Sequence, residues 1–420
     1  MSESPQLREW LEAIEAAHPD EIELGLERVA AVAGRMGLLP APMPVVLIAG
    51  TNGKGSTLAF LEAALAAAGH RVGAYTSPHL FRFNERIRVA GRTAGDDELV
   101  AAFEAVEAAR RGVSLTYFEF TTLAAMAMFA ERAEVALLEV GLGGRLDAVN
   151  IWEPAVSVIT SVDLDHQAFL GADREAIGGE KAGILRAGVP AVCGDPQPPR
   201  SVSGRDDVPL RLWGRDFRAE AGEGGWTWVA ADRHLGPLPL PRLAGDYQLR
   251  NAATAIAAAS LLPGALQPDL PAWRQALAAA AVPGRGQVIE AEVPVWLDVA
   301  HNPAAAAQLA DLLGQRPVPG RTLAVFGAMR DKAVAEVAGA MAGVIDRWYP
   351  CGIAGERGLS GGEVAARLPV ALEAVADPAA DCARALAAAR AEACPGRDRI
   401  IAFGSFLVVA SALEALDAAD

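Results

Sequence analysis

The chain has 420 residues, of which 52% are hydrophobic and 21% charged, and its formal net charge is −15. This length favours two or three domains, and the apolar content is ample for buried cores, which excludes wholesale disorder. The acidic balance argues against a nucleic-acid partner, because neutralising phosphates needs a basic face, but it leaves room for a local basic pocket.

The sequence shows no sign of export or membrane insertion. Its N-terminal segment is polar and acidic, without the basic start and apolar core of a signal peptide. The longest apolar runs are alanine-rich and interrupted by charge, so we expect no membrane-spanning helix. The four cysteines are scattered and form no CxxC pair, which indicates neither a disulfide framework nor a zinc site. We therefore expect a cytoplasmic protein.

The first half of the chain alternates short apolar runs with helical segments, after a helical lead-in that ends near Pro40. The predicted buried strands are 45–49, 72–76, 135–140 and 155–160. The predicted helices between them are 56–68, 96–111 and 121–132, the second capped by Asp96. This alternation predicts a parallel, doubly wound sheet with helices on both faces.

The residue pattern changes around residues 195–241, where Pro, Gly, Trp and short alternating runs indicate a β-rich insertion or an irregular surface segment. A helix over 251–262 follows. A second α/β series starts near Val293, with strands predicted at 295–299, 323–326 and 400–403 and a helix at 304–313. We therefore predict a larger domain over 1–284 and a smaller, Rossmann-like α/β domain over 285–420, joined by a hinge at 283–286.

The segment GTNGKGST, residues 50–57, follows a predicted strand and opens a predicted helix. Its glycines let backbone N–H groups approach phosphates, and the helix N-terminus adds partial positive charge. Lys54 can neutralise the β- and γ-phosphates, and a hydroxyl of Ser56 or Thr57 can ligate Mg²⁺. The usual pattern ends GK[ST], so the intervening Gly55 makes this a variant loop. The alternative is a plain Gly-rich turn; we interpret the segment as the P-loop of an ATP-binding domain.

Polar side chains follow three further predicted strands, at Ser77, Glu139 and His166. The carboxyl ends of parallel strands share one edge of a sheet, so these groups are expected beside the phosphates. Hydroxyl, carboxylate and imidazole can form a Mg²⁺ shell, although a lone histidine is more often structural. From the residues alone both roles stay open for His166, and composition favours a solvated helix lysine for Lys181.

Ten segments, in one order, resemble the bifunctional dihydrofolate synthase/folylpolyglutamate synthase family of the Mur ligase superfamily. The resemblance runs from about Leu24 to Phe406 and so covers nearly the whole chain. The segments are GTNGKGS, SPHLFRFNERIRV, LTYFEF, LLEVGLGGRLDAVN, ITSVDLDHQAFLG, EKAGI, GDYQLRNAATA, VPGRGQ, LDVAHNP and FGSF.

This resemblance implies an ATP-dependent ligase of folate biosynthesis. The γ-phosphoryl group of ATP would pass to a substrate carboxylate, and the amine of L-glutamate would displace phosphate from the acyl phosphate to form an amide. The implied acyl substrates are dihydropteroate and tetrahydrofolate or its polyglutamates. Catalysis would rest on alignment and on charge stabilisation by Mg²⁺ and Lys54. We expect a monomer without nucleic-acid or membrane partners.

The resemblance also implies nucleotide and metal residues. Lys54, His166 and Lys181 would be catalytic, with Lys181 carbamylated so that its negative charge supports the metal site. The implied ATP-binding residues are Thr51, Asn52, Gly53, Lys54, Gly55, Ser56, Asn251, Arg285, Asp298 and His301. The implied ligands of two Mg²⁺ ions are Ser56, Ser77, Glu139 and His166. Because Asp298 belongs to the second domain, the site would close as the domains approach.

The implied pterin site is built from three segments. Its residues are Glu21, Ile22, Glu23, Leu24, Thr116, Tyr117, Phe118, Glu119, Leu146, Asp147 and Ala148. Two aromatic rings suit stacking on a flat heterocycle, and a carboxylate suits amino-pyrimidine donors, although both rings could instead belong to the core. The chain departs from the family at Gly286, where an aromatic residue often stands, and at 326–332, which keeps the Asp-Lys pair but varies before it.

Three other functions stay open. Another Mur-type ligase, acting on a cell-wall nucleotide precursor, would share the chemistry but not the LTYFEF and SPHL context. A folylpolyglutamate synthase without dihydropteroate activity is the second alternative. A nucleotide-dependent switch protein is the third, and it would have no need for Glu139, His166 and Lys181 together.

Overall fold

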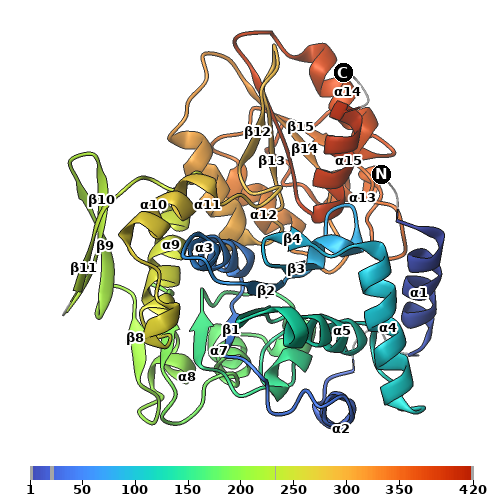
Figure 1. The fold of residues 1–420 in the computed structure, drawn as a ribbon. Coiled ribbons are helices and arrows are strands. Elements are labelled where there is room, and N and C mark those ends of the chain that lie inside the picture. Colours follow the sequence, from blue (N-terminus) through green and yellow to red (C-terminus); the bar gives the residue numbers. More distant parts are fainter. Residues whose placement is uncertain (1–2, 19–22, 232, 418–420) are drawn as a thin grey trace. The chain divides into compact units, whose positions relative to one another are not determined.

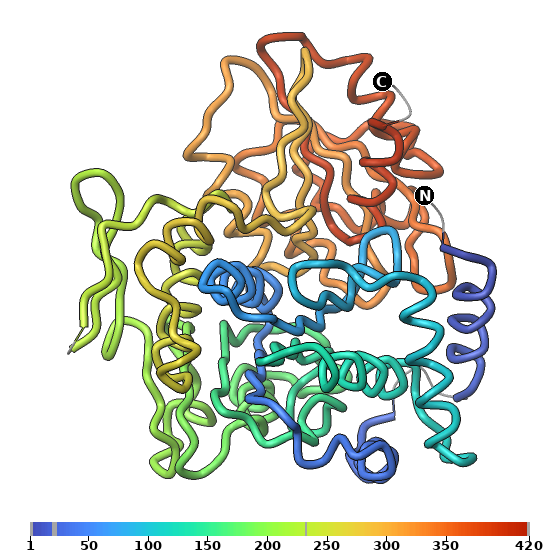
Figure 2. Tube along the Cα trace, viewed as in Figure 1, coloured from blue at the N-terminus to red at the C-terminus, as the bar shows by residue number. Residues whose placement is uncertain are grey.

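The computed structural model describes residues 3–18, 23–231 and 233–417, whose course is shown in Figures 1 and 2. It consists of two compact units. Unit 1 comprises Met1–Asp163, Gln167–Arg242 and Gln248–Ala281. Unit 2 comprises Leu164–His166, Leu243–Tyr247 and Val282–Asp420.

An eight-stranded sheet forms the centre of unit 1, in the order β4-β3-β2-β5-β1-β6-β7-β8. The parallel strands are β2 (Val72–Tyr75), β5 (Val135–Glu139), β1 (Val45–Ala49), β6 (Val156–Ile159), β7 (Ala191–Cys193) and β8 (Leu210–Leu212). The antiparallel edge strands are β3 (Ile87–Val89) and β4 (Arg92–Thr93). In the centre, Ile48 pairs with Glu139 and Val158, so the strand ends that carry polar residues are in register.

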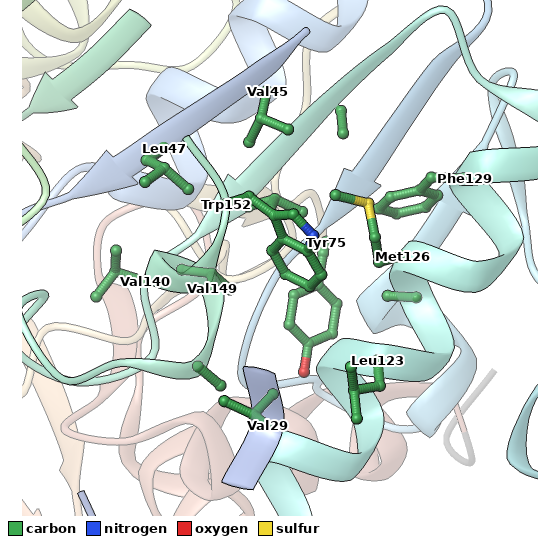
Figure 3. Close-up of a cluster of buried hydrophobic side chains, with 14 of the residues drawn as sticks. Val29, Val45, Leu47, Tyr75, Leu123, Met126, Phe129, Val140, Val149 and Trp152 are labelled. Carbon is green, nitrogen blue, oxygen red and sulfur yellow. The ribbon is translucent and has the colours of Figure 1, made fainter. Parts of the chain in front are cut away.

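Helices cover both faces of this sheet, which confirms the predicted doubly wound arrangement. One face is covered by α5 (Tyr117–Arg132), with α4 (Asp96–Arg110), α1 (Pro5–Ala16) and α2 (Glu27–Arg35) packed around it. Figure 3 shows part of this core, to which Leu47 and Tyr75 of the strands and Leu123 and Phe129 of α5 all belong. The other face is covered by α3 (Lys54–Ala67), on which α10 (Leu270–Ala279) packs.

The remaining helical elements of unit 1 are η1 (Phe83–Arg86), η2 (Ala148–Ile151), α6 (Gln167–Leu170), α7 (Arg174–Ala182), α8 (Arg200–Ser203), α9 (Asp246–Ala259, whose first two residues group with unit 2) and η3 (Gly264–Leu266). A separate antiparallel sheet has the order β11 (Arg233–Leu238), β10 (Gly225–Ala230), β9 (Phe217–Gly222), and stands at the left edge of Figure 1. Buried Trp228 anchors it by donating from Nε1 to the Ala253 carbonyl at 3.1 Å.

Several helix starts differ from the sequence-based prediction, and α9 begins at Asp246 and not at residue 251. Helix α5 begins at Tyr117 and not at residue 121, because Thr116 and Glu119 form a capping box that starts the helix earlier. The predicted cap Asp96 is instead the first residue of α4, and Gly95 occupies the cap position. The Asp96 carboxylate is engaged elsewhere: it accepts from Arg82 at 2.6 Å and from the Ser4 backbone N–H at 2.7 Å.

A five-stranded sheet forms the centre of unit 2, in the order β12 (Gln287–Ile289), β13 (Val295–Asp298), β16 (Arg399–Phe403), β14 (Thr322–Phe326), β15 (Arg347–Pro350). Only β12 runs antiparallel to its neighbour. Helices α11 (Pro303–Gly314) and α12 (Val334–Met341) share a core with Trp296 and Trp348. Helices α14 (Cys382–Glu392) and α15 (Phe406–Asp417) contact the sheet as well, and α13 (Gly361–Arg367) contacts β15.

No helix within the described ranges has the length and hydropathy that spanning a membrane requires.

Candidate active site

The P-loop joins β1 to α3 and is shaped by close backbone contacts. A Cβ on Gly50 would lie 1.9 Å from Thr160 Oγ1, and a Cβ on Gly53 would lie 2.6 Å from Asn251 Oδ1. Gly53 also has a φ of 89°, in the left-handed region that favours glycine. The Thr51 N–H donates to the Ser161 carbonyl at 2.8 Å, which ties the loop to the end of β6. The first N–H groups of α3 are therefore presented at a fixed position, as an anion site requires.

Side chains around this loop form a polar network. Lys54 Nζ donates to the carbonyls of Gly50 at 3.1 Å and Thr51 at 3.4 Å, so the lysine lies folded over its own loop. Ser56 Oγ accepts from Gln248 Nε2 at 3.2 Å, and Asn251 Nδ2 donates to Gln248 Oε1 at 3.0 Å. The network thus links Ser56 and Asn251, both implied as nucleotide residues, through a buried glutamine.

Sequence reasoning missed Gln248. It stands three residues before Asn251, so the two occupy the same face of α9. A polar pair at this spacing inside an alanine-rich helix is the signal that could have identified it.

The predicted metal ligands of unit 1 meet at the carboxyl edge of the sheet. Glu139 ends β5 and is buried, and its Oε2 accepts from the Ser77 N–H at 3.3 Å. The same oxygen lies 3.7 Å from the position of a Cβ on Gly55, so the carboxylate faces the P-loop. Carboxylate and hydroxyl oxygens are the donors that Mg²⁺ prefers, and this donor set fits such an ion.

His166 lies in Leu164–His166, the short segment that groups with unit 2, and it has a positive φ of 50°. In the described part of the chain no group of three or more His, Cys, Asp or Glu side chains forms a ready metal site. The metal ligands that the family resemblance implies instead include the hydroxyls of Ser56 and Ser77. Phosphate oxygens of the nucleotide would complete the coordination of the ions.

Lys181 is buried, with 4% of its surface exposed, so the composition-based expectation of a solvated lysine is wrong. It lies in the last turn of α7, on the face that also buries Ile177 and Gly178. The helical spacing of four residues from Ile177 places the amine on the inner face, which its composition alone did not reveal.

A cavity of about 870 Å³ lies within unit 1, and we call it the unit 1 cavity. It brings together the described members of the implied pterin site with the first predicted metal ligand after β2. These are Glu23, Leu24, Thr116, Tyr117, Phe118, Glu119, Leu146, Asp147, Ala148 and Ser77. Glu21 and Ile22, also predicted, lie outside the described residues. Side chains that sequence reasoning did not assign also line the cavity, including His79, Phe81 and Arg86.

The aromatic residues of the cavity wall also belong to the core. Phe118 packs 5.6 Å from Tyr75, and Tyr117 packs edge-on at 6.2 Å from Phe83, measured between ring centroids. Both are partly buried against the main core while lining the cavity. The two alternatives for these rings are therefore not exclusive, because one face packs inward and the rest borders the open space.

The two buried carboxylates of the wall have different partners. Glu119 caps α5 by accepting from the Thr116 N–H at 2.8 Å, and it also accepts from Arg28 at 3.1 Å. Asp147 accepts from backbone N–H groups, those of Leu142 at 2.8 Å and Val149 at 3.1 Å. Burial raises the pKa of Asp147 to about 6, against the lowering effect of these hydrogen bonds.

In unit 2, Asp298 ends β13 and is buried. Its carboxylate accepts from the Gly286 N–H at 2.7 Å and the Ala300 N–H at 2.8 Å, and burial raises its pKa although Arg285 opposes this. The Arg285 guanidinium lies 5.2 Å from the centroid of the Phe406 ring. Gly286 adopts a φ of 57°, so a side chain at this departure from the family pattern would be strained.

Also in unit 2, three polar side chains meet around Asp165. It lies 3.1 Å from His301 Nε2 and accepts from Lys332 Nζ at 2.5 Å and Asn302 Nδ2 at 3.2 Å. Burial would raise the pKa of Asp165, but the hydrogen bond and charge of His301 and the charge of Lys332 outweigh it and hold that pKa well below its usual range. Of this cluster, sequence reasoning assigned only His301, because the partners are distant in the chain.

Residues 284–406 match the family model of the Mur ligase glutamate ligase domain. The chain is 42% identical to a dihydrofolate synthase/folylpolyglutamate synthase of Escherichia coli K12, over 98% of this chain and 96% of that protein. It is 36% identical to the protein of the same name from Bacillus subtilis, over 74% and 77% of the two chains.

Solved structures agree with these relatives. The structure of E. coli FolC in complex with DHPP and ADP superposes with a TM-score of 0.92 and 40% identity, covering 100% of this chain and 99% of that one. A bifunctional folylpolyglutamate synthase/dihydrofolate synthase with Mn, AMPPNP and L-glutamate bound gives a TM-score of 0.89 and 42% identity, covering 99% of each. The resemblance drawn from the motifs is thereby confirmed: the chain belongs to the dihydrofolate synthase/folylpolyglutamate synthase family and is a ligase of the Mur type.

Proposed function

We propose that this ligase uses ATP to join L-glutamate to dihydropteroate and to tetrahydrofolate or its polyglutamates. One observation carries the proposal: Ser77 lines the unit 1 cavity and also donates its N–H to Glu139, whose carboxylate faces the P-loop. A carboxylate held in the cavity would thus lie next to a nucleotide phosphate. Relatives of at least 40% identity bind ADP or AMPPNP, Mn, DHPP and L-glutamate, which supports this assignment.

In the proposed reaction the substrate carboxylate attacks the γ-phosphorus of ATP and releases ADP. The glutamate amine then attacks the acyl carbon, the C–N bond forms, the C–O bond to phosphate breaks, and the amine loses a proton. Lys54 would leave the carbonyls of Gly50 and Thr51 to neutralise the transferred phosphoryl group. The fixed N–H groups of α3 would hold the other phosphate oxygens.

We propose that Ser56, Ser77, Glu139 and His166 hold two divalent cations. Such ions would neutralise charge on the phosphates and on the acyl oxygen. The proposed nucleotide residues of unit 1 are Thr51–Ser56 and Asn251, and those of unit 2 are Arg285, Asp298 and His301. Buried Lys181 would act in its carbamylated form. Carbamylation would replace its positive charge with a negative charge that supports the proposed divalent cations.

Relatives that are 42% identical and named for both activities favour the bifunctional enzyme over a folylpolyglutamate synthase alone. The volume of the unit 1 cavity and its buried carboxylate Asp147 suit the amino-pterin ring that both acyl substrates share, whose ring N–H groups are donors. Free thiols at all four cysteines agree with the cytoplasmic location that we propose, and we propose a monomer.

The test is product formation with each acyl substrate separately. Purified protein with ATP, Mg²⁺ and L-glutamate should release ADP only when dihydropteroate or tetrahydrofolate is present, and a glutamylated product should appear by mass spectrometry. Activity with tetrahydrofolate but not with dihydropteroate would identify the protein as a folylpolyglutamate synthase without the first activity. ADP release that ignores both acyl substrate and glutamate would favour a switch protein.

A further inference from the structure

Arg86 occupies a distinctive position in the wall of the unit 1 cavity. It ends the short helix η1 between β2 and β3, and among the described residues lining the cavity it is the only arginine or lysine. Its guanidinium carbon lies 5.5 Å from the ring centroid of Tyr117 and 5.7 Å from that of Phe83. These aromatic contacts hold the guanidinium in one place without neutralising its charge.

One side of the guanidinium is already fixed by a neutral partner. Arg86 Nε donates to His79 Nδ1 at 2.8 Å. Because this ring nitrogen accepts the hydrogen bond, it carries no proton, and the imidazole does not offset the charge of the guanidinium. The two terminal nitrogens of Arg86 make no hydrogen bond to any described residue. Neither is among the buried atoms that lack a partner, so both are accessible.

The neighbouring arginines behave differently. Arg82 is paired with Asp96 at 2.6 Å, and Arg88 with Glu62 at 2.8 Å. Arg86 has no carboxylate within 4 Å in the described part of the chain, and the adjacent Glu85 is occupied by three backbone N–H groups. Arg86 is therefore a positioned cation whose planar fork faces open space, which is the geometry that binds a carboxylate in bidentate fashion.

The chemistry of the proposed substrates indicates which substrate carboxylate Arg86 would bind. Dihydropteroate has a single carboxylate, and that group is the one that reacts. Tetrahydrofolate has two, because its glutamyl residue carries a reacting γ-carboxylate and a non-reacting α-carboxylate a few carbon atoms away. Arg86 is bonded to His79, which stands two residues after Ser77, and all three line the cavity, so the arginine shares a stretch of wall with the Ser77–Glu139 contact.

We propose that Arg86 binds the α-carboxylate of the terminal glutamyl residue of the folate substrate, and so serves the second glutamylation but not the first. This inference rests on the proposed function and adds a specificity residue to it. One cavity would then accept two acyl substrates of different length, because the longer one carries the extra anion that this arginine recognises.

The experiment compares the wild type with Arg86→Gln on three acyl substrates: dihydropteroate, tetrahydrofolate and the tetrahydrofolate analogue with an α-carboxamide. A charge-assisted pair contributes enough that its loss should raise KM for tetrahydrofolate about tenfold or more, with KM for dihydropteroate within about threefold. The wild type should disfavour the carboxamide by a similar factor, and Arg86→Gln should not distinguish it from the carboxylate. Arg92→Gln, an exposed arginine in β4, is the matched control and should leave all three KM values unchanged.

Several outcomes would overturn the inference. A wild type that does not discriminate between carboxylate and carboxamide excludes it without any variant. Equal losses of Arg86→Gln on dihydropteroate and tetrahydrofolate would assign the arginine to a shared or structural role. Failure of the wild type to ligate glutamate to either acyl substrate would instead refute the proposed function itself, so the two failures are distinguishable.

Discussion

The P-loop and the unit 1 cavity lie in the same unit but are built in opposite ways. The P-loop is one short chain segment whose shape is set by backbone contacts and by glycines that admit no Cβ. The cavity is walled by side chains from the N-terminal helix, the segment after β2, the start of α5 and the turn before η2. We expect variants of the first to affect every substrate equally, and variants of the second to separate the substrates.

The largest effect is expected at Lys54. Lys54→Ala removes the P-loop cation that neutralises the phosphates, so kcat should fall about 1000-fold with dihydropteroate and with tetrahydrofolate alike. Steady-state ADP release with each substrate measures this, and Arg92→Gln is the control for loss of an unrelated cation. Near-normal turnover of Lys54→Ala would refute the P-loop assignment.

The next effect is expected at Lys181. Lys181→Ala should lower kcat by about 100-fold, the range typical of groups that support a metal site. If a carbamate is the active species, acetate or formate should restore part of the activity, and the same acids should not restore Lys54→Ala. The absence of rescue at any acid concentration would count against carbamylation.

A smaller and substrate-selective effect is expected at Asp147. Asp147→Asn should raise KM for dihydropteroate about tenfold, because a buried charged acceptor is lost, and it should affect KM for ATP little. In the wild type KM for dihydropteroate should rise as the pH falls below about 6, where this carboxyl becomes protonated, and the rise should be absent in Asp147→Asn. A pH-independent KM in the wild type would contradict the pterin role.

Asp147 should also affect stability in a defined direction. Its pKa is about 6 in the folded chain and 3.8 ordinarily, so between these values the folded state binds the proton that the unfolded state has released. Its contribution to the free energy of unfolding therefore decreases as the pH rises through this window, by about 3 kcal/mol in total. Urea unfolding at pH 5 and pH 7.5 measures this, and Asp147→Asn should lack that part of the dependence.

The smallest effect is expected at Gln248, which bridges Ser56 and Asn251. Gln248→Ala should raise KM for ATP about fivefold, the equivalent of one ordinary hydrogen bond. Gln267→Ala is the matched control: Gln267 donates to the carbonyls of Ser260 and Leu262 and accepts from Arg233, and its loss should leave KM for ATP unchanged. A change in KM confined to the acyl substrates would contradict the expected separation of roles between the P-loop and the unit 1 cavity.

The same contrast explains how much the sequence could predict. The P-loop and the strand ends are local patterns, so the order of strands and helices and the position of Lys54 could be predicted from periodicity and glycine spacing. Helix α5 was predicted to start too late, because the Thr116–Glu119 capping box lies outside the apolar stripe on which that prediction rested. The burial of Lys181 depends on packing around α7 and not on its own segment.

The roles of Arg86 and Asp165 required tertiary structure. Arg86 is one of several arginines in its segment, and only the pairing of Arg82 and Arg88 with other residues singles it out. Asp165 is separated by 136 residues from His301 and by 167 from Lys332, so no local pattern could join them. Contacts of this kind between distant residues are not encoded in hydrophobic periodicity.

The three lysines differ from the arginines in where they are placed. Of the 37 basic residues only Lys54, Lys181 and Lys332 are lysines, and none is exposed: the first is folded over its loop, the second is buried and the third is held by Asp165. Amine-directed footprinting would therefore meet almost no background from the protein surface. Apart from the N-terminal amine, each labelled position would be one of these three, and its protection could be followed as nucleotide or acyl substrate is added.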